Sequence, residues 1–588
     1  MKNAEIAAIF DRMADILEVL NDNAFRVRSY RKASEVVGDQ AEDIAALAQS
    51  GRLGELPGIG AAFVEKITEY LAEGKISAYE QLKARVPEGV TEMLRVPGLG
   101  PKTAGLFWQK ANVTSVAELA KAIDEGRLAG LPGIGAKKLE NLKKGIASYL
   151  GGQGRELLGN ALPVAEEIAA LLAKVEGVLQ VLPAGSLRRR RETIGDVDIL
   201  VASDRGKDVV AAFVGLPMVK DVLASGETKG SVRVEGGLQV DVRVVSPDSF
   251  GAAAQYFTGS KAHNIRLRDL AISKKLKLNE YGVFQGEKRI AGRTEQEVYA
   301  ALGLPWMPPE LREDRGEIEA ALEDKLPALI EEKDIRGDLQ MHSTASDGGA
   351  SLEEMARACI ALGYEYMAIT DHSQSLKIAN GLTPARLREQ RKEIGRLNKD
   401  LAPFRILAGV EVDILSDGSL DLPDKALAAL DFVIASIHMG MQQDADRLTA
   451  RMVKAMQNPY VCAIAHPTGR VLAQRDPYPL HFDEVLRVAK ETGTALEINA
   501  YADRLDLNDV QARAARDAGV KLLIDTDAHA PAHLPMMRLG VATARRGWVR
   551  KADVLNTLPL DGLLAALSVK SHAQSGSQRT AHENPDTA

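Results

Sequence analysis

The chain has 588 residues, of which 45% are hydrophobic, 26% charged and 4% aromatic, and its formal net charge is −7. This length exceeds what one hydrophobic core supports, so we expect two to four domains with mostly aliphatic cores. The composition is that of a soluble globular protein, and the net charge excludes a general polyanion-binding coat while leaving room for local basic grooves.

The cysteines and the apolar runs argue against a disulfide-rich secreted protein and against a membrane-spanning protein. Cys359 and Cys462 are the two cysteines, and each stands in an apolar segment, so we expect buried thiols and no disulfide framework. The N-terminal residues lack the apolar core of a signal peptide, and no uninterrupted apolar run is long enough to span a bilayer. We therefore expect a cytoplasmic protein without a membrane partner, and a disordered polar tail over residues 571–588.

The first 150 residues contain a threefold repeat of the pattern Leu/Val-Pro-Gly-Ile/Leu-Gly, at 56–60, 96–100 and 131–135. The glycines permit a tight turn, and the N–H groups that open the following helix lack intrahelical partners, so each turn can hold one phosphate. Such contacts position a nucleic acid without reading its sequence. The alternative is a packing corner between helices, which three copies make less favoured. The expected backbone-contacting residues are Gly58, Gly60, Lys66, Gly98, Gly100, Lys102, Gly133 and Gly135.

A loop of glycine, serine and four arginines at 185–195 leads into an apolar run that begins with Asp196-Val-Asp198. On a strand these two aspartates share one face, where their carboxylates repel each other unless a cation lies between them. Asp241, in a second alternating segment, offers a third carboxylate. Three carboxylates, a phosphate loop and neighbouring arginines predict a two-metal phosphoryl-transfer site. The alternative is a solvated strand end beside a surface turn.

An aromatic pair follows in Tyr-Phe-Thr-Gly-Ser, residues 256–260, ahead of the polar residues 263–268. This arrangement can stack on a sugar and a base, although an ordinary buried aromatic turn is the alternative. Three prolines between 305 and 309 and the charge-rich stretch behind them then predict a semi-rigid linker over residues 311–335.

Residues 336–570 repeat a different pattern, in which apolar runs end in histidine or carboxylate side chains and alternate with helical segments. Near-continuous apolar strands between helices predict a parallel sheet covered on both faces. Seven such strands suggest a barrel, whose chemistry belongs at the carboxyl ends of the strands. Five histidines, two aspartates and a glutamate at successive ends predict a metal cluster, for which imidazole favours Zn²⁺, Mn²⁺ or Fe and carboxylate admits Mn²⁺.

Residues 1 to about 310 resemble the family X DNA polymerases, the DNA polymerase beta group. The resemblance is carried by residues 185–189, 195–198, Asp241 and 256–268, with 279–282 fitting the following hairpin. It implies that Asp196, Asp198 and Asp241 hold two metal ions and that Asp241 activates the primer 3′-hydroxyl. The implied nucleotide-binding residues are Gly185, Ser186, Arg189, Gly195, Tyr256, Phe257, Gly259 and Asn264, with Arg268 contacting DNA.

The three repeats resemble helix–hairpin–helix motifs, which are common in DNA repair proteins. The N-terminal region is similar to the family's lyase domain, and the Schiff-base lysine of that domain falls on Lys66. A neighbouring helper lysine is replaced by Ala62, so we favour a phosphate contact over lyase chemistry for Lys66.

Residues 336–570 resemble the polymerase and histidinol phosphatase (PHP) domain. Gln340 departs from the family's opening His-x-His pattern, and this neutral ligand puts one metal position in doubt. The resemblance implies metal-dependent phosphoester hydrolysis as a 3′–5′ exonuclease, with 3′-end cleaning and abasic-site cleavage as related activities. The implied metal ligands are His342, Asp347, His372, Glu411, His438, His466, Asp527 and His529.

We therefore expect a multidomain α/β and α+β protein with helix–hairpin–helix motifs, a polymerase beta-like palm and thumb, and a distorted seven-stranded β/α barrel. The expected boundaries are 1–85 for a lyase-like domain, 86–153 for helix–hairpin–helix fingers, 154–250 for the palm, 251–310 for the thumb, 311–335 for the linker and 336–570 for the PHP domain.

The expected protein is a monomeric DNA repair polymerase that fills short gaps and also trims 3′ ends. Its substrates would be gapped or nicked DNA and dNTPs, with Mg²⁺ or Mn²⁺ at the palm and Mn²⁺ or Zn²⁺ at the barrel. Three alternatives stay open: a nucleotidyltransferase acting on RNA ends or a small molecule, a DNA-end-binding scaffold with a structural metal barrel, and a barrel that is a small-molecule phosphatase.

Overall fold

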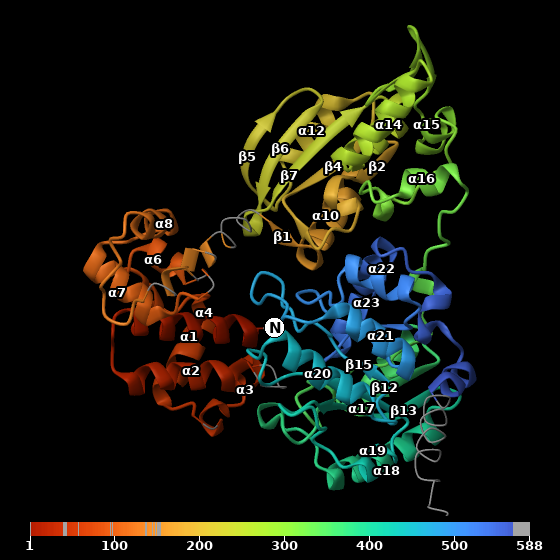
Figure 1. The fold of residues 1–588 in the computed structure, drawn as a ribbon. Coiled ribbons are helices and arrows are strands. Elements are labelled where there is room, and N and C mark those ends of the chain that lie inside the picture. The colour runs from red at the N-terminus through yellow and green to blue at the C-terminus, as the bar shows by residue number, and fades with distance from the viewer. Residues whose placement is uncertain are drawn as a thin grey trace, which may run out of the picture. The chain divides into compact units, whose positions relative to one another are not determined.

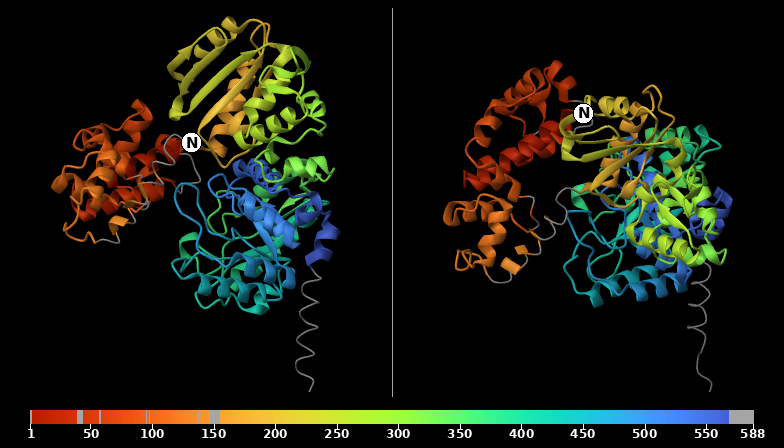
Figure 2. Two further views of the ribbon diagram at one scale, coloured as in Figure 1. Left: turned by 45° about the horizontal axis from the view of Figure 1, so that its top comes forward. Right: turned by 90° about the horizontal axis from the view of Figure 1, so that it is seen from above.

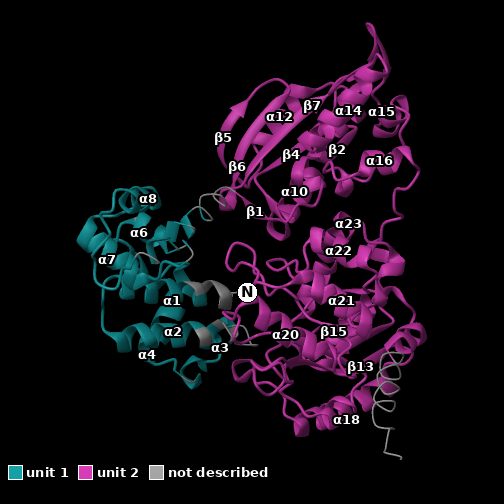
Figure 3. Ribbon diagram, in the orientation of Figure 1, with its two compact units in different colours: residues 1–153 teal, residues 154–588 magenta. Residues whose placement is uncertain are grey.

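The computed structural model describes residues 2–38, 44–56, 58–94, 96, 98–135, 138–140, 142–143, 145–146, 149 and 155–567. They belong to two compact units, Met1–Gln153 and Gly154–Ala588 (Figure 3). The expected disordered tail, 571–588, lies outside the described residues. Among the helices that are described, none combines the length and the apolar character needed to cross a bilayer.

The first unit is helical, and one hydrophobic core joins its helices. In the first helix Ile6, Phe10, Met13 and Leu17 are fully buried, as their helical spacing predicts. Gly105 allows a close helix contact, because a Cβ there would lie 2.3 Å from the Val19 carbonyl oxygen. The helices are α1 Lys2–Val19, α2 Ala24–Gly38, α3 Ile44–Gln49, α4 Ala61–Glu73, α5 Ser77–Lys83, α6 Glu88–Met93, α7 Pro101–Ala111 and α8 Val116–Asp124.

The second unit begins with a five-stranded sheet in the order β2-β4-β7-β6-β5 (Figure 1). Strand β4 pairs in parallel with β7, and the other pairs are antiparallel. Val197, Ile199 and Val201 of β4 pack in the core with α10 and α12, whereas Leu200 and Ala202 pack on α13. The strands are β2 Gln180–Pro183, β4 Asp196–Ala202, β5 Val219–Ser225, β6 Lys229–Val234 and β7 Gln239–Val245, and the helices are α10 Leu158–Leu172, α12 Gly206–Val214 and α13 Phe250–Thr258.

A smaller helical region with a three-stranded sheet follows α13 and encloses its own core. The stretch predicted as a linker, 311–335, differs from that expectation at its start: Arg312 and Glu317 are fully buried and a helix, α16, begins at Glu317. Exposed residues are interspersed with buried ones along the rest of the stretch, at 314, 316, 319, 322–325, 328 and 331–333. The elements are α14 Lys261–Ser273, β8 Lys277–Asn279, β9 Gly282–Gln285, β10 Lys288–Ala291, α15 Glu295–Ala301 and α16 Glu317–Leu322.

The third region is a seven-stranded parallel sheet whose strands follow one another in chain order. Its residues run from green to blue in Figures 1 and 2. The sheet closes into a barrel, because Met341 after the first strand bridges Ala528 after the last and the His342 N–H donates to the Ala528 carbonyl at 2.9 Å. The strands are β11 Gly337–Asp338, β12 Tyr366–Ile369, β13 Arg405–Asp413, β14 Phe432–Ser436, β15 Ala463–Ile464, β16 Ala495–Asn499 and β17 Leu522–Asp525.

Helices cover this barrel, and every residue of β12, β14, β16 and β17 is buried, as the apolar runs predict. Cys359 and Cys462 are not joined in a disulfide; Cys359 is buried as expected, but Cys462 is only partly buried. The helices are α17 Leu352–Ala361, α18 Pro384–Asp400, α19 Asp424–Leu427, α20 Ala445–Met456, α21 Phe482–Thr492, α22 Asp509–Ala518 and α23 Met537–Arg546.

The palm and the barrel share a hydrophobic core within the second unit. Leu505 and Leu539 of the barrel region are almost fully buried among palm residues, including Leu158 and Leu162 of α10. Gly159 is part of this contact, since a Cβ there would lie 2.6 Å from the Ala502 Cβ. The two regions therefore pack side chain to side chain.

Candidate active sites

The pairing of β4 with β7 creates the first site. The parallel register sets Asp198 directly opposite Asp241, and Asp196 lies two residues earlier on the same face of the sheet. The Asp241 carboxylate accepts hydrogen bonds from the Ser231 hydroxyl and from Gln239 Nε2, the latter at 3.2 Å. The structure thus brings together the three carboxylates that the sequence singled out.

Like charges crowd together in this cluster, which makes it a candidate cation site. Burial raises the pKa of the Asp198 carboxyl to about 6, helped by the charges of Asp196 and Asp241. Gly185 has no side chain to fill the space beside this carboxylate, because a Cβ there would lie 2.7 Å from Asp198 Oδ2. The donor set, carboxylate oxygens only, is the one that Mg²⁺ and Mn²⁺ prefer.

In the presence of a chelator, Asp198→Asn should stabilise the protein at pH 8. The folded state binds the Asp198 proton more tightly than the unfolded state, because the pKa is about 6 against 3.8. Stability is therefore lost as pH rises from about 4 to 6, and above pH 6 the ionised carboxylate costs about 3 kcal/mol. Melting temperatures measured with EDTA should differ at pH 8 and converge near pH 4. A difference that grows as pH falls would contradict this reading, and Asp221→Asn, on the exposed strand β5, is the matched control.

The loop ahead of β4 carries the predicted phosphate-binding residues. We call residues 185–192 the phosphate loop; it opens with the short helix α11, Gly185–Arg188, and contains Ser186, which is half-buried. The Arg189 guanidinium donates from Nε to Glu313 at 3.1 Å and from Nη1 to the Thr258 carbonyl at 2.5 Å. Its orientation is therefore set by two protein groups.

Arg188 pairs with a carboxylate of the protein, whereas its neighbour Arg189 is expected to bind a phosphate. The Arg188 guanidinium makes a bidentate pair with Glu295, at 2.9 and 2.7 Å, and also donates to the Thr258 hydroxyl at 2.6 Å. Burial raises the pKa of Glu295, but the charge of Arg312 and the bonds from Arg188 hold it near 2. Neither Glu295 nor Glu313 could be singled out from the sequence, because both stand more than 100 residues after the loop.

The predicted nucleotide-contacting residues gather around the end of α13. Tyr256 and Phe257 pack edge to face with ring centroids 5.1 Å apart, and Gly259 follows the helix directly. The Asn264 amide donates to the Tyr256 carbonyl at 2.7 Å and accepts from Gln255 at 2.6 Å. Arg268 is exposed one helical turn beyond, and Gly195 lies next to the carboxylates, immediately before β4.

The three helical hairpins share one backbone geometry. Gly58, Gly98 and Gly133 have φ values of +92°, +85° and +75°, which favour glycine. In each hairpin the residue after this glycine donates its N–H to a carbonyl three residues earlier, at 3.0 Å. Gly60 and Gly100 then precede the helices α4 and α7. The carbonyls of Gly60, Gly100 and Gly135 each accept hydrogen bonds from the N–H groups three and four residues later.

The lysines behind the hairpins are placed differently. Lys102 is exposed in the first turn of α7, whereas the Lys66 ammonium donates to the Ala62 carbonyl at 2.9 Å. Two prolines of the repeated pattern, Pro57 and Pro97, lie outside the described residues.

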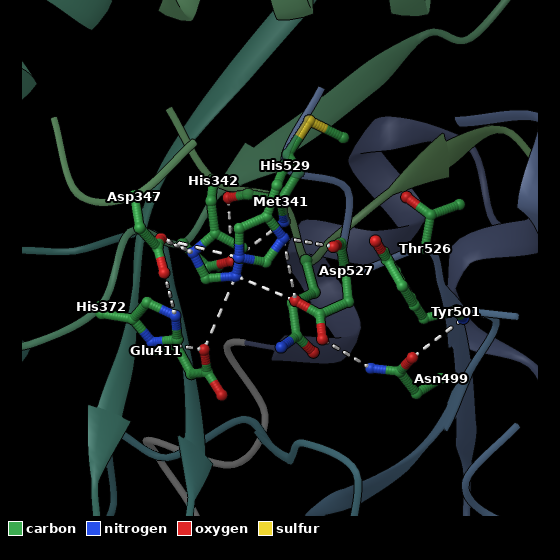
Figure 4. A network of polar contacts seen from close by, with 12 residues as sticks. Met341, His342, Asp347, His372, Glu411, Asn499, Tyr501, Thr526, Asp527 and His529 are labelled. Atoms are coloured by element: carbon green, nitrogen blue, oxygen red, sulfur yellow. Dashed lines mark hydrogen bonds and ion pairs between the residues drawn. The ribbon is translucent and has the colours of Figure 1, made fainter. Parts of the chain in front are cut away.

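The second site is at the carboxyl ends of the barrel strands, where all eight predicted ligands converge. Figure 4 labels His342, Asp347, His372, Glu411, Asp527 and His529. Glu411 is central: its carboxylate lies 2.9 Å from His372 Nδ1, 3.0 Å from His466 Nε2 and 3.4 Å from His438 Nε2. Two groups bring their ligand atoms within 4.8 Å of one another, one of His342, Asp347, His372 and His529, the other of His372, Glu411 and His438.

Asp527 completes the arrangement beside the first group. Its Oδ1 lies 3.0 Å from His342 Nε2, and Asn499 Nδ2 donates to its Oδ2 at 3.1 Å. His342 stacks between His372 and His529, with ring centroids 4.3 Å from each. The rings are thus held close together with their nitrogens facing one space, as Figure 4 shows for the labelled residues.

The donor atoms of this cluster fit bound cations. His342 Nδ1 and His466 Nδ1 are buried and have no hydrogen-bond partner among the described residues. Buried polar atoms are rarely left unpaired, so these point to ligands that the protein atoms alone do not supply. Burial raises the pKa of the Glu411 carboxyl, but the facing His372 and His438 hold it well below its usual range.

Gln340 does not join either ligand group. It is fully buried, and with its amide nitrogen turned toward Glu497 it donates to that carboxylate. Burial, with the charges of Asp525 and Asp527, raises the pKa of Glu497 well above its ordinary value. Gln340 and Glu497 are therefore occupied with each other at the position where the PHP pattern has its first histidine.

Sequence reasoning also missed the residues that orient the ligands. Asp413 accepts a hydrogen bond from His438 Nδ1 at 2.7 Å, and Asn499 holds Asp527. Asp413 follows Glu411 by two residues on β13. Because residues two apart on a strand point to the same face, this spacing could have placed Asp413 beside the ligands. Ligand histidines are commonly fixed by such partners.

Four protein-family models match the chain. They describe a helix-hairpin-helix domain at residues 1–76, a SAM-like helix-hairpin-helix tandem at 90–148, a DNA polymerase beta thumb at 253–313 and a PHP domain at 338–501. Together with the seven-stranded parallel barrel, these matches confirm the predicted fold class.

Similar proteins cover either the whole chain or one part of it. The DNA polymerase/3'-5' exonuclease PolX of Bacillus subtilis (strain 168) is 41% identical over 572 residues, which are 96% of this chain and 99% of the relative. A probable phosphatase of Acetivibrio thermocellus is 33% identical over 204 residues, 33% of this chain and 78% of the relative. DNA polymerase lambda of Arabidopsis thaliana is 28% identical over 345 residues, 53% of this chain and 62% of the relative.

Proposed function

This chain belongs to the PolX family, to which the Bacillus subtilis DNA polymerase/3'-5' exonuclease also belongs, and from this premise we propose a division of labour between two sites. The palm adds dNTPs to a primer in gapped or nicked DNA, and the barrel removes nucleotides from 3′ ends. The observation that best supports this is the presence of two separate clusters of cation-binding side chains, one of carboxylates alone and one rich in imidazole.

In the palm, Asp196, Asp198 and Asp241 would hold Mg²⁺ or Mn²⁺. A bound pair of such ions supplies charge neutralisation at the transferring phosphoryl group. Ser231 and Gln239 orient the Asp241 carboxylate, which is the group that we assign to take the proton of the primer 3′-hydroxyl. Arg189 and Ser186 would hold the triphosphate, and the Tyr256 and Phe257 region would bind the incoming sugar and base.

In the barrel, the eight converging ligands would hold Mn²⁺ or Zn²⁺. Cations bound there supply an activated water for hydrolysis of a phosphodiester. The protein's own contribution is a rigid, mostly buried set of donors, with Asp413 and Asn499 fixing the orientation of His438 and Asp527. Abasic-site cleavage is a related activity that the same donors would support.

A single experiment tests both halves. The full-length protein is incubated with DNA that carries a short gap and a 5′-labelled primer, in Mg²⁺ or Mn²⁺, with and without dNTPs. We expect extension to the end of the gap when dNTPs are present, and stepwise shortening from the 3′ end when they are absent. Addition that ignores the template would support the nucleotidyltransferase alternative, and a primer of unchanged length would contradict both assignments.

The hairpins are proposed to hold the DNA backbone. Lys102→Ala should weaken binding of gapped DNA equally for different sequences and lower the slope of log Kd against log salt by about 0.9, the loss of one phosphate contact. The exposed Lys102 ammonium can reach a phosphate at the turn that precedes α7. Fluorescence anisotropy at four salt concentrations would measure the slope. Lys121→Ala, on α8 and outside the hairpins, is the control; equal slopes for all three proteins would remove this role.

One observation favours a second candidate for the barrel. The Acetivibrio thermocellus relative, which matches a third of this chain, is named a probable phosphatase. The barrel would then act on phosphomonoesters, including a 3′-phosphate on DNA. Comparing hydrolysis of a 3′-phosphate primer, a 3′-hydroxyl primer and a small aryl phosphate by the full chain decides between the two.

A further inference from the structure

The phosphate loop of the palm is held by the barrel at two places. Arg546, at the end of α23, donates to the Arg189 carbonyl at 2.7 Å, and only 2% of its side chain is exposed. At the other end of the loop, Arg470 makes a bidentate pair with Glu192, at 3.1 and 2.7 Å. Arg470 follows the barrel ligand His466 by four residues, so the two sites are joined by short segments.

Arg546 also contacts the group that orients Arg189. Glu313 Oε1 accepts from Arg546 Nη1 at 2.9 Å and from Arg189 Nε at 3.1 Å. A guanidinium has five N–H donors, and those of Arg189 Nη2 have no acceptor among the described residues. Glu313 therefore fixes the plane of the Arg189 guanidinium while leaving one edge available to a phosphate.

Burial makes this linkage stiff. Arg546 Nη2 donates to Asp509 at 2.7 Å, and Asp509 also pairs with Arg315 at 2.8 Å. Both carboxylates, Glu313 and Asp509, are mostly buried. Hydrogen-bonded charges in a low-dielectric setting resist displacement, because an unpaired buried charge is costly.

We propose that Arg546 and Arg470 of the barrel region are positioning residues for nucleotide addition in the palm. Arg546 acts through Glu313 and the Arg189 backbone, and Arg470 acts through Glu192, so that the triphosphate meets a preformed loop. This inference rests on the proposed polymerase function of the palm. It means that side chains of the barrel region influence the affinity of the palm for dNTP.

Arg546→Lys in the full chain tests the proposal by steady-state primer extension. Lysine keeps the charge but cannot reach the Arg189 carbonyl, Glu313 and Asp509 with the same fork. We expect KM for dNTP to rise about tenfold, the scale of one lost charge-assisted hydrogen bond, with kcat changed by less than about twofold. The 3′–5′ exonuclease rate of the same preparation should stay at the wild-type value.

Arg538→Lys is the matched control, because Arg538 also lies on α23 and bridges to the palm but not to the phosphate loop. It pairs with Glu166 of α10 at 3.0 and 3.1 Å. Its KM for dNTP should equal that of the wild type. Arg470→Lys should also raise KM for dNTP. In the double variant Glu313→Gln/Arg546→Lys, KM for dNTP should be no higher than in the more impaired of the two single variants, because both residues act through the same contact.

Two results overturn the proposal. One is an unchanged KM for dNTP in both Arg546→Lys and Arg470→Lys. The other is an equal fall in extension, exonuclease rate and melting temperature, which would show a purely structural role. Failure of the wild-type chain to extend any primer would instead refute the proposed function, before any variant is compared.

Discussion

Asp241→Asn should reduce nucleotide addition by about a thousandfold or more, the scale of losing a group that stabilises developing charge. Asp241 stands opposite Asp198 in the β4–β7 register, and its carboxylate is already oriented by Ser231 and Gln239. An amide at this position keeps the shape of the side chain but loses the charge that holds a cation and accepts a proton. Degradation of the primer from its 3′ end should continue at the wild-type rate.

Primer extension and shortening measured on the same gapped DNA check this separation. Asp221→Asn is a suitable control, since Asp221 is an exposed aspartate in the same sheet, on β5. Its extension rate should match that of the wild type. Loss of both activities in Asp241→Asn, with normal melting, would mean that one site serves both reactions and would end the two-site assignment.

Glu411→Gln should abolish hydrolysis at the barrel and spare extension, with a loss of about a thousandfold or more, comparable with removal of a catalytic charge. The Glu411 carboxylate lies 2.9 Å from His372 Nδ1, 3.0 Å from His466 Nε2 and 3.4 Å from His438 Nε2. Replacing it with a neutral amide removes a negative charge from the centre of the cluster and weakens cation binding.

The readouts are the exonuclease rate and the Mn²⁺ content of the purified protein. Asp431→Asn is the matched control, because Asp431 lies at the opposite end of the barrel, where its carboxylate accepts the Ala408 N–H at 2.9 Å. Wild-type exonuclease activity in Glu411→Gln, with reduced Mn²⁺ content, would place hydrolysis elsewhere in the chain.

Local patterns predicted the parts of both sites that lie on single strands. The alternation of Asp196 and Asp198, and the histidines that end apolar runs, follow from strand geometry and needed no long-range information. Gln340 was recognised as a departure, but its partner Glu497 was passed over because it stands inside an apolar run.

Contacts between segments far apart in the chain could not be predicted in this way. The bond from Arg546 to the Arg189 carbonyl joins residues 357 positions apart, and no composition or spacing signals it. Burial within the stretch expected to be a linker could not be predicted for the same reason: Arg312 and Glu317 are buried against Glu295 and His263. A charged residue looks exposed in sequence until its partner is known.

The burial of Leu505 and Leu539 among palm residues limits how the enzyme can be dissected. Cutting the chain near residue 330 would expose hydrophobic surface on both fragments. Burial of each leucine stabilises the fold by about 1.5–3 kcal/mol, and the cut would remove this contribution. A truncated polymerase that precipitates or fails to synthesise DNA would then reflect the loss of this shared hydrophobic core. Its failure would not identify the catalytic groups that were deleted. Single side-chain replacements within the intact polypeptide are the sounder way to assign each reaction.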